Sequence, residues 1–150
     1  MGSCISLCRD TELQKATLQT AQEFGVCGYK AEAKVVDVYD GDTLTLAFRF
    51  CGKIFKKRCR IEGVDCAELR SKDEEERRVG NVAKDYVSNL VLNKVVWVEF
   101  SESSDKYGRL LAQIFPKKGG ASLAAILISA GLGYEYHGEH KRAFRDWYAC

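Results

Sequence analysis

Hydrophobic residues along the chain recur with two different periods. Segments rich in Val, Leu and Phe are separated by Asp-Gly and Cys-Gly turn signals, which is typical of β-strands. Past residue 78, apolar side chains recur instead at steps of three and four, which predicts one buried helical face. The predicted elements are strands at 33–39, 43–50 and 53–64, a loop at 68–78 that opens a helix reaching residue 91, strands at 94–100 and 110–115, and a helix at 121–130.

Five short strands with a helix after the third favour a small closed barrel of the oligonucleotide-binding type, a mainly β fold with added helices (α+β). A sandwich of helices packed on a sheet is the alternative, and the pattern alone does not choose between them. The length of 150 residues fits one domain with its own core. We expect this domain at residues 33–150, preceded by an extension at 1–32 that contains a short amphipathic helix.

The amino-acid composition excludes only a few classes of protein. Lys and Arg number 23 against 21 Asp and Glu, so the net charge of +2 does not by itself indicate a nucleic-acid partner. Residues 53–60, however, hold five basic residues in eight. The seven cysteines include no CxxC pair, which argues against a zinc site, and their odd number without a signal peptide argues against a secreted disulfide framework. We therefore expect an intracellular protein with reduced thiols.

The segment "VYDGDTLTL" at 38–46 places two acids around a glycine within an apolar run. An Asp-Gly pair between alternating hydrophobic residues predicts a tight hairpin turn in which Gly41 takes a positive φ. This turn accounts for Asp40 and Gly41 but not for Asp42. The second carboxylate is either a polar turn residue or a ligand for a hard cation such as Ca²⁺, which prefers oxygen ligands.

Further charged residues follow where the strand pattern ends. Arg60 closes the basic run, Asp65 and Glu68 stand in "VDCAEL", and Arg109 ends "DKYGR". Arginine suits the equatorial oxygens of a phosphodiester, and a glutamate can position and deprotonate water. Each feature also has a plain structural interpretation. The acids could favour a helix N-terminus, the basic run could protect a strand edge, and "DKYGR" could be a hairpin loop.

Taken in order, "DGDT", Arg60, "VDCAE" and "DKYGR" resemble the signature of the staphylococcal nuclease (thermonuclease) family. The resemblance extends over about residues 33–136. It implies a five-stranded oligonucleotide-binding barrel with about three helices. It also implies a Ca²⁺-dependent endonuclease that hydrolyses DNA and RNA by in-line attack of water. We expect a monomer that prefers single strands.

The resemblance also assigns roles to individual residues. The implied Ca²⁺ ligands are the carboxylates of Asp42 and Asp65 and the backbone carbonyl of Cys66, with Asp40 close by and acting through water. The implied catalytic residues are Glu68, which orients or deprotonates the attacking water, and Arg60 and Arg109, which bind the phosphate and its transition-state charge. The implied nucleotide contacts are Lys106, Tyr107, Tyr134 and Tyr136.

Three features depart from the family pattern. Cys66-Ala67 stands where the family usually has Thr-Pro, so the loop is less fixed although a carbonyl ligand survives the change. The segment around Tyr134 is about two residues shorter than in the bacterial enzyme. The C-terminal helix is curtailed, and we expect Trp147 and Tyr148 to pack where a longer helix would lie.

The first residues, "MGSCIS", fit the pattern for myristoylation of Gly2, with Cys4 and Cys8 available for palmitoylation. Because one myristoyl chain binds membranes only weakly, the second acyl group would matter. An expression scar or chance is the alternative. Acylation predicts attachment to the cytoplasmic face of a membrane.

Three functions therefore compete. The first is an active nuclease, the second an inactive binding module for nucleic acid or protein, and the third a membrane-attached interaction protein. The complete set of acids and arginines favours the nuclease.

Overall fold

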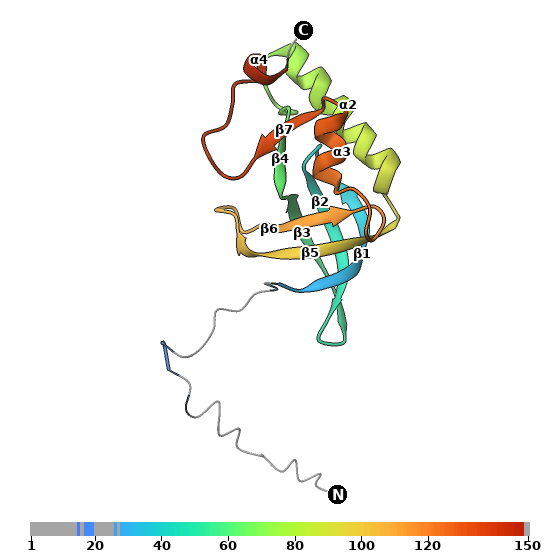
Figure 1. The fold of residues 1–150 in the computed structure, drawn as a ribbon, viewed down its shortest axis with the longest axis vertical. Helices are drawn as coiled ribbons and strands as arrows, with labels where there is room; N and C mark the ends of the chain where they lie inside the picture. The colour runs from blue at the N-terminus through green and yellow to red at the C-terminus, as the bar shows by residue number, and fades with distance from the viewer. Residues whose placement is uncertain (1–14, 16, 20–25, 27, 149–150) are drawn as a thin grey trace, which may run out of the picture.

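The computed structural model describes residues 15, 17–19, 26 and 28–148. Within these residues, five strands close a barrel in the order β1-β2-β3-β6-β5 (Figure 1). Neighbouring strands are antiparallel except β3 and β6, which run parallel over three residue pairs. The strands are β1 (Lys30–Val38), β2 (Thr43–Phe50), β3 (Lys53–Ile61), β5 (Val95–Ser104) and β6 (Leu110–Phe115). The predicted barrel of the oligonucleotide-binding type is confirmed.

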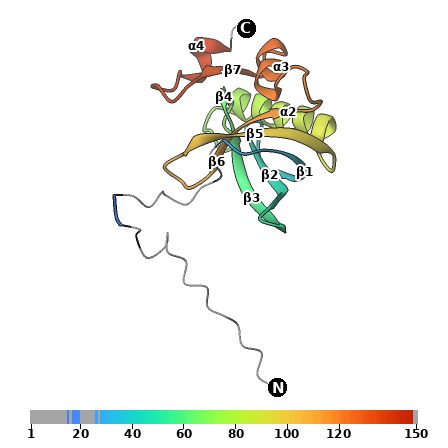
Figure 2. The same cartoon turned by 60° about the horizontal axis from the view of Figure 1, so that its bottom comes forward.

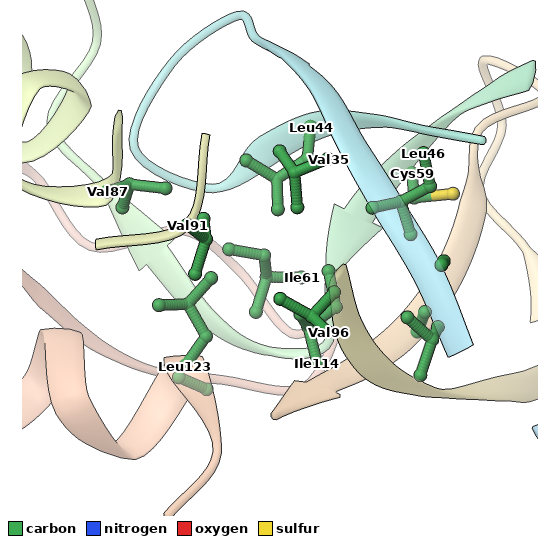
Figure 3. Close-up of a cluster of buried hydrophobic side chains, with 14 of the residues drawn as sticks. Val35, Leu44, Leu46, Cys59, Ile61, Val87, Val91, Val96, Ile114 and Leu123 are labelled. Carbon is green, nitrogen blue, oxygen red and sulfur yellow. The ribbon is translucent and has the colours of Figure 1, made fainter. Parts of the chain in front are cut away.

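The barrel interior is filled by side chains from alternate strand positions, as the period of two requires. Leu44 and Leu46 of β2, Ile61 of β3 and Ile114 of β6 are fully buried (Figure 3). The helix α2 (Glu74–Val91) adds its apolar face to the same cluster. Asp73 caps its N-terminus, because the Asp73 carboxylate accepts hydrogen bonds from the backbone N–H groups of Glu75 and Glu76 in the first helical turn.

A second, two-stranded sheet lies beside the barrel and was not predicted. It pairs β4 (Gly63–Cys66) with β7 (Gly133–Tyr136). The sequence pattern joined β3 and β4 into one strand, but the chain turns at Gly63, which adopts a φ of 89°. After this turn, Asp65 and Cys66 pair with Tyr134 and Gly133 of β7.

Two short helices accompany this second sheet. They are α3 (Leu123–Ser129) and α4 (Phe144–Trp147), and α3 contacts both β4 and β7. Figures 1 and 2 show these elements at the end of the barrel opposite to the β2–β3 hairpin. Trp147 and Tyr148 pack with Phe144 against a small cluster formed with Ala67 and Val79. The short α4 is therefore held by aromatic contacts.

The described part of the chain contains no helix that is long and apolar enough to cross a membrane. Gly2, Cys4 and Cys8 lie outside the described residues, as does most of the segment expected to form the first helix.

The prediction of a positive φ at Gly41 is wrong. The left-handed positions among the described residues do not include Gly41, whereas Cys51 and Gly52, in the two-residue β2–β3 turn, both have positive φ. Gly41 is constrained by close packing instead. A Cβ atom at this position would lie 2.8 Å from the Cβ atom of Ala83 on α2 and 3.0 Å from the Cβ atom of Cys66. The glycine therefore lets the β1–β2 loop approach both α2 and β4.

We expect Gly41→Ala to lower the free energy of unfolding by about 1–3 kcal/mol, because the added methyl group overpacks this contact. The measurement is urea unfolding followed by circular dichroism. The double variant Gly41→Ala/Ala83→Gly tests the cause, since it removes the nearest of the crowded contacts, with only Cys66 left against the added methyl group, at the cost of one helical glycine. Simple additivity of the two single losses would contradict the packing explanation.

Candidate functional site

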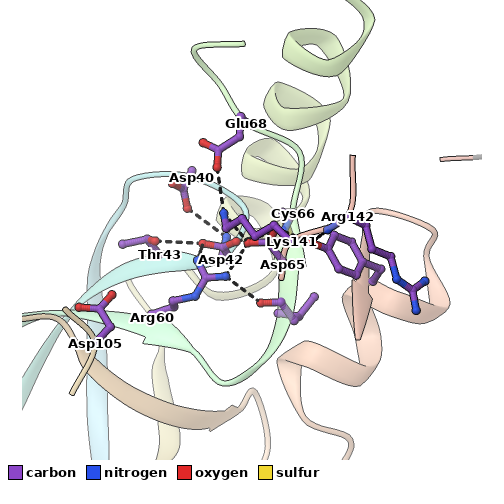
Figure 4. A network of polar contacts seen from close by, with 12 residues as sticks. Asp40, Asp42, Thr43, Arg60, Asp65, Cys66, Glu68, Asp105, Lys141 and Arg142 are labelled. Carbon is purple, nitrogen blue, oxygen red and sulfur yellow. Dashed lines mark hydrogen bonds and ion pairs between the residues drawn. The ribbon is translucent and has the colours of Figure 1, made fainter. Parts of the chain in front are cut away.

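The centre of the site is a guanidinium group held between two carboxylates. Nη1 of Arg60 lies 2.7 Å from Oδ1 of Asp42, and its Nη2 lies 2.6 Å from Oδ1 of Asp65 (Figure 4). All three residues are buried, at 8 %, 5 % and 4 % exposure. The strand register explains the first pair, because Arg60 lies opposite Thr43, the neighbour of Asp42, across β2 and β3.

The remaining oxygens of the two carboxylates also accept hydrogen bonds. Oδ2 of Asp42 accepts from the backbone N–H of Cys66 at 3.0 Å, and its Oδ1 accepts from Oγ1 of Thr43 at 3.1 Å. Oδ2 of Asp65 accepts from the hydroxyl of Tyr134 at 2.9 Å. The β1–β2 loop and the second sheet are thus joined through the Asp42–Cys66 contact.

Asp40 and Glu68 stand at the rim. Oδ1 of Asp40 accepts a hydrogen bond from the backbone N–H of Asp42 at 3.1 Å, so this carboxylate shapes the loop. Glu68 is exposed, and its Oε1 lies 3.0 Å from Nζ of Lys141. The same ammonium group lies 2.9 Å from Oδ1 of Asp65. Lys141 therefore links the buried pair to the exposed glutamate.

Arg109 reaches the site from the β5–β6 turn. Its Nη1 donates to Oγ1 of Thr43 at 2.9 Å, and its Nε lies 2.6 Å from Oδ2 of Asp105. Asp105 also accepts hydrogen bonds from the backbone N–H groups of Tyr107 and Arg109, which fixes the turn. The "DKYGR" segment thus forms a turn whose acid orients its own arginine.

Asp42, Arg60, Glu68 and Arg109 line one cleft of roughly 1500 Å³, whereas Thr43 and Asp65 do not. Lys106, Tyr107 and Tyr136 line it, and Tyr107 is 72 % exposed. Tyr134 does not line the cleft; it is 6 % exposed, and besides its bond to Asp65 it accepts from the backbone N–H of Arg142 at 3.0 Å. Tyr134 therefore orients Asp65.

Burial and neighbouring charges shift the pKa values of Asp42 and Asp65 in opposite directions. Burial, together with the Asp40 and Asp65 carboxylates, raises the pKa of Asp42 to about 6 despite the attraction of Arg60. Burial also disfavours ionised Asp65, but hydrogen bonds from Lys141 and Arg60 outweigh it and lower the pKa of that carboxyl. Burial raises the pKa of the Cys66 thiol well above its usual value. Cys66 is therefore a neutral thiol here.

The sequence profile described as "Staphylococcal nuclease homologue" matches residues 58–147, more than half of the chain. The chain belongs to the staphylococcal nuclease homologue family. No curated protein sequence gave a significant match. Membership gives the chain a nuclease-type or nucleic-acid-binding function.

The family match covers part of the site directly. It includes Arg60, Asp65, Glu68 and Arg109, whereas Asp42 precedes it. In the folded structure, Asp42 contacts Arg60 and Cys66, which both lie within the matched residues. The acids predicted from "DGDT" and "VDCAE" therefore meet at one centre.

Whether a Ca²⁺ ion suits this centre depends on charge and ligand type. Members of the staphylococcal nuclease homologue family generally depend on Ca²⁺, a hard cation that takes oxygen ligands. Asp42 and Asp65 both lie against the cation of Arg60, Asp65 and Glu68 lie against that of Lys141, and Asp40 stands beside Asp42. Burial is the largest cause of the raised pKa of Asp42, and the carboxylates of Asp40 and Asp65 add to it. Carboxylate oxygens are the type of ligand that a hard divalent cation takes. Among the described residues, however, no group of three or more His, Cys, Asp or Glu side chains is arranged to hold a metal.

Sequence reasoning missed three contributors to the site. Thr43 and Asp105 stand inside the two recognised motifs, so attention to every polar residue of those motifs would have found them. Lys141 carries no such signal, because it lies in a loop 73 residues beyond its partner Glu68.

We expect Arg60→Ala to lower the free energy of unfolding by about 3–5 kcal/mol, because it leaves two buried carboxylates without their shared cation. Arg78→Ala is the matched control, since its pair with Glu75 is exposed and such pairs contribute little. Urea unfolding at neutral pH compares the two. Equal losses would contradict a buried electrostatic centre.

Proposed function

We propose that this protein is a Ca²⁺-dependent nuclease that hydrolyses phosphodiester bonds in DNA and RNA. The observation that carries the proposal is the convergence of two buried aspartates, an exposed glutamate and two oriented arginines beside one cleft, which all of them except Asp65 line. Family membership supports the nucleic-acid substrate. The cleft is open and lined by aromatic and basic residues, which suits one flexible strand better than a rigid duplex. Single strands should therefore be cut faster.

In this proposal the residues divide the work. The carboxylates of Asp42 and Asp65 and the carbonyl of Cys66 would hold Ca²⁺. When bound, the ion would supply positive charge to the phosphate oxygens. Glu68, exposed at the rim, positions water and accepts its proton. Arg60 and Arg109 donate hydrogen bonds to phosphate oxygens that gain charge in the transition state.

The contacts of Lys141 add a step before substrate binding. Its ammonium group pairs with both Asp65 and Glu68, so it must move before these carboxylates act. The side chain is about half exposed and lies in the loop between β7 and α4, where it has room to leave.

A catalytically inactive binding module is the second candidate. The observation that favours it is that every carboxylate oxygen of Asp42 and Asp65 already accepts a hydrogen bond from the protein. Cleavage assays separate the two functions, because a module would bind an oligonucleotide without cutting it.

The purified full chain should degrade single-stranded DNA and RNA when Ca²⁺ is added and should stop when a chelator is present. Gel electrophoresis of a labelled oligonucleotide measures this directly. Undiminished cleavage in excess chelator would rule out the metal assignment. Binding without any cleavage at high Ca²⁺ would favour the inactive module.

Two substitutions separate the role of the metal ligands from that of the arginines. Asp42→Ala should weaken Ca²⁺ binding, so that part of the lost rate returns at high Ca²⁺. Arg109→Ala removes a donor aimed at developing charge, which typically reduces kcat by about 10²–10³, and added Ca²⁺ should not restore it. Arg109→Lys should recover little, because a point charge does not reproduce a bidentate fork.

The measurement is kcat on a short oligonucleotide across a Ca²⁺ titration. Arg70→Ala is the matched control, because Arg70 is an exposed arginine that does not line the cleft. Near-wild-type turnover by Arg109→Ala would remove this residue from the catalytic assignment.

A further inference from the structure

The first six residues of β3 form an overhang beyond the closed barrel. β3 pairs with β2 from Lys53 to Arg60, but it pairs with β6 only from Cys59 to Ile61. Within the described part of the chain, one edge of residues 53–58 therefore has no strand partner, and all six residues are exposed. In Figure 1 this segment belongs to the long hairpin that leaves the barrel.

The overhang carries cations that have no acidic partner among the described residues. Lys53, Lys56, Lys57 and Arg58 form no ion pair with any carboxylate in the part of the chain that the structure describes. By contrast, Arg60, Arg109 and Lys141 are each paired. A run of unpaired like charges repels itself, and an anionic partner would relieve this repulsion.

The unpaired cations lead towards the catalytic centre. Side chains two residues apart on a strand point to the same side, so Lys56 and Arg58 continue the side on which Arg60 lies. Each step of two residues covers about 6.6–6.8 Å. Lys57 and Arg58 both line the cleft that contains Arg60. Lys56, Arg58 and Arg60 thus form a path of positive charge along one side of β3 to the buried pair, and Lys57 lines the cleft although its side chain starts from the other side of the strand.

An aromatic ring stands where this path meets the site. Tyr39 directly precedes the β1–β2 loop that carries Asp40 and Asp42, is 37 % exposed and lines the same cleft. The guanidinium carbon of Arg58 lies 4.5 Å from the centroid of the Tyr39 ring. Proteins that bind single-stranded nucleic acid combine a basic groove with aromatic rings on which bases stack. Tyr39 and Arg58 together offer both.

We propose that Tyr39, Lys57 and Arg58 form a subsite that binds the single strand flanking the cleaved bond, with one base stacked at Tyr39 and neighbouring phosphates along β3. The subsite rests on the proposed nucleic-acid substrate but not on hydrolysis. Single-stranded nucleic acid is favoured over an anionic membrane because these residues line the cleft. The exposed apolar pair Ile54 and Phe55 lies nearer the hairpin tip and does not line it.

The test measures binding of labelled oligothymidylates to the full chain by fluorescence anisotropy in chelator. Probes of about 3 and about 12 nucleotides are compared, because oligonucleotide-binding folds contact about 4–16 nucleotides. Tyr39→Ala should lower the affinity for the long probe by about 5- to 150-fold, which is the range for one stacked base. The affinity for the short probe should fall far less. Tyr39→Phe should retain binding, since the ring remains.

Arg58→Ala should reduce the slope of log affinity against log salt by about 0.7 if it removes one phosphate contact. Lys34→Ala, which removes an exposed charge outside the cleft, is the control and should leave the slope unchanged. In a second experiment, the wild type and the same variants are titrated with vesicles that contain anionic phosphatidylserine, and their membrane binding is compared.

Unchanged binding of the long probe by Tyr39→Ala and Arg58→Ala would overturn the subsite, even if the wild type cuts DNA normally. Reduced vesicle binding with unchanged oligonucleotide binding would assign the overhang to a membrane instead. Failure of the wild type to bind either probe, at any salt concentration, would overturn the proposed function as well.

Discussion

The structure of the site depends on one buried cation shared by two buried acids. Arg60 forms ion pairs with Asp42 and Asp65, which stand on different parts of the fold, and without it the two carboxylates would repel each other in a region of low dielectric. The contact therefore determines both where the barrel meets the second sheet and where negative charge collects. Stability and chemistry are linked at this point, because the group that holds the centre together also faces the cleft.

Two glycines allow the segments around the Arg60 ion pairs to pack closely together. Gly41 brings the β1–β2 loop against α2 and Cys66, and Gly133 does the same between β7 and β4, where a Cβ atom would lie 2.7 Å from Cγ2 of Val64. Both glycines stand beside residues that touch the carboxylates. A chain that adds a methyl group at either position must shift an element that carries a site residue.

The cations of the cleft fall into two groups with different physical environments. Arg60 and Arg109 are oriented by acids, so their positions are set before any substrate arrives. Preorganised donors of this kind stabilise developing charge without further rearrangement. The cations of the β3 overhang have no acidic partner among the described residues and remain free to follow a flexible strand. Oriented cations suit catalysis, whereas free cations suit binding along a backbone.

The sequence alone was enough to predict the barrel strands, the position of α2 and most of the charged residues of the site. This succeeds because strand period, helix period and the motifs around Asp42, Asp65 and Arg109 are local properties of the chain. The tertiary structure decided the rest. The pairing of β4 with β7, the reason for glycine at position 41, the contact of Tyr134 with Asp65 and the contacts of Lys141 all join segments far apart in sequence. No local pattern encodes such contacts, because they depend on how loops and sheets pack around a shared centre.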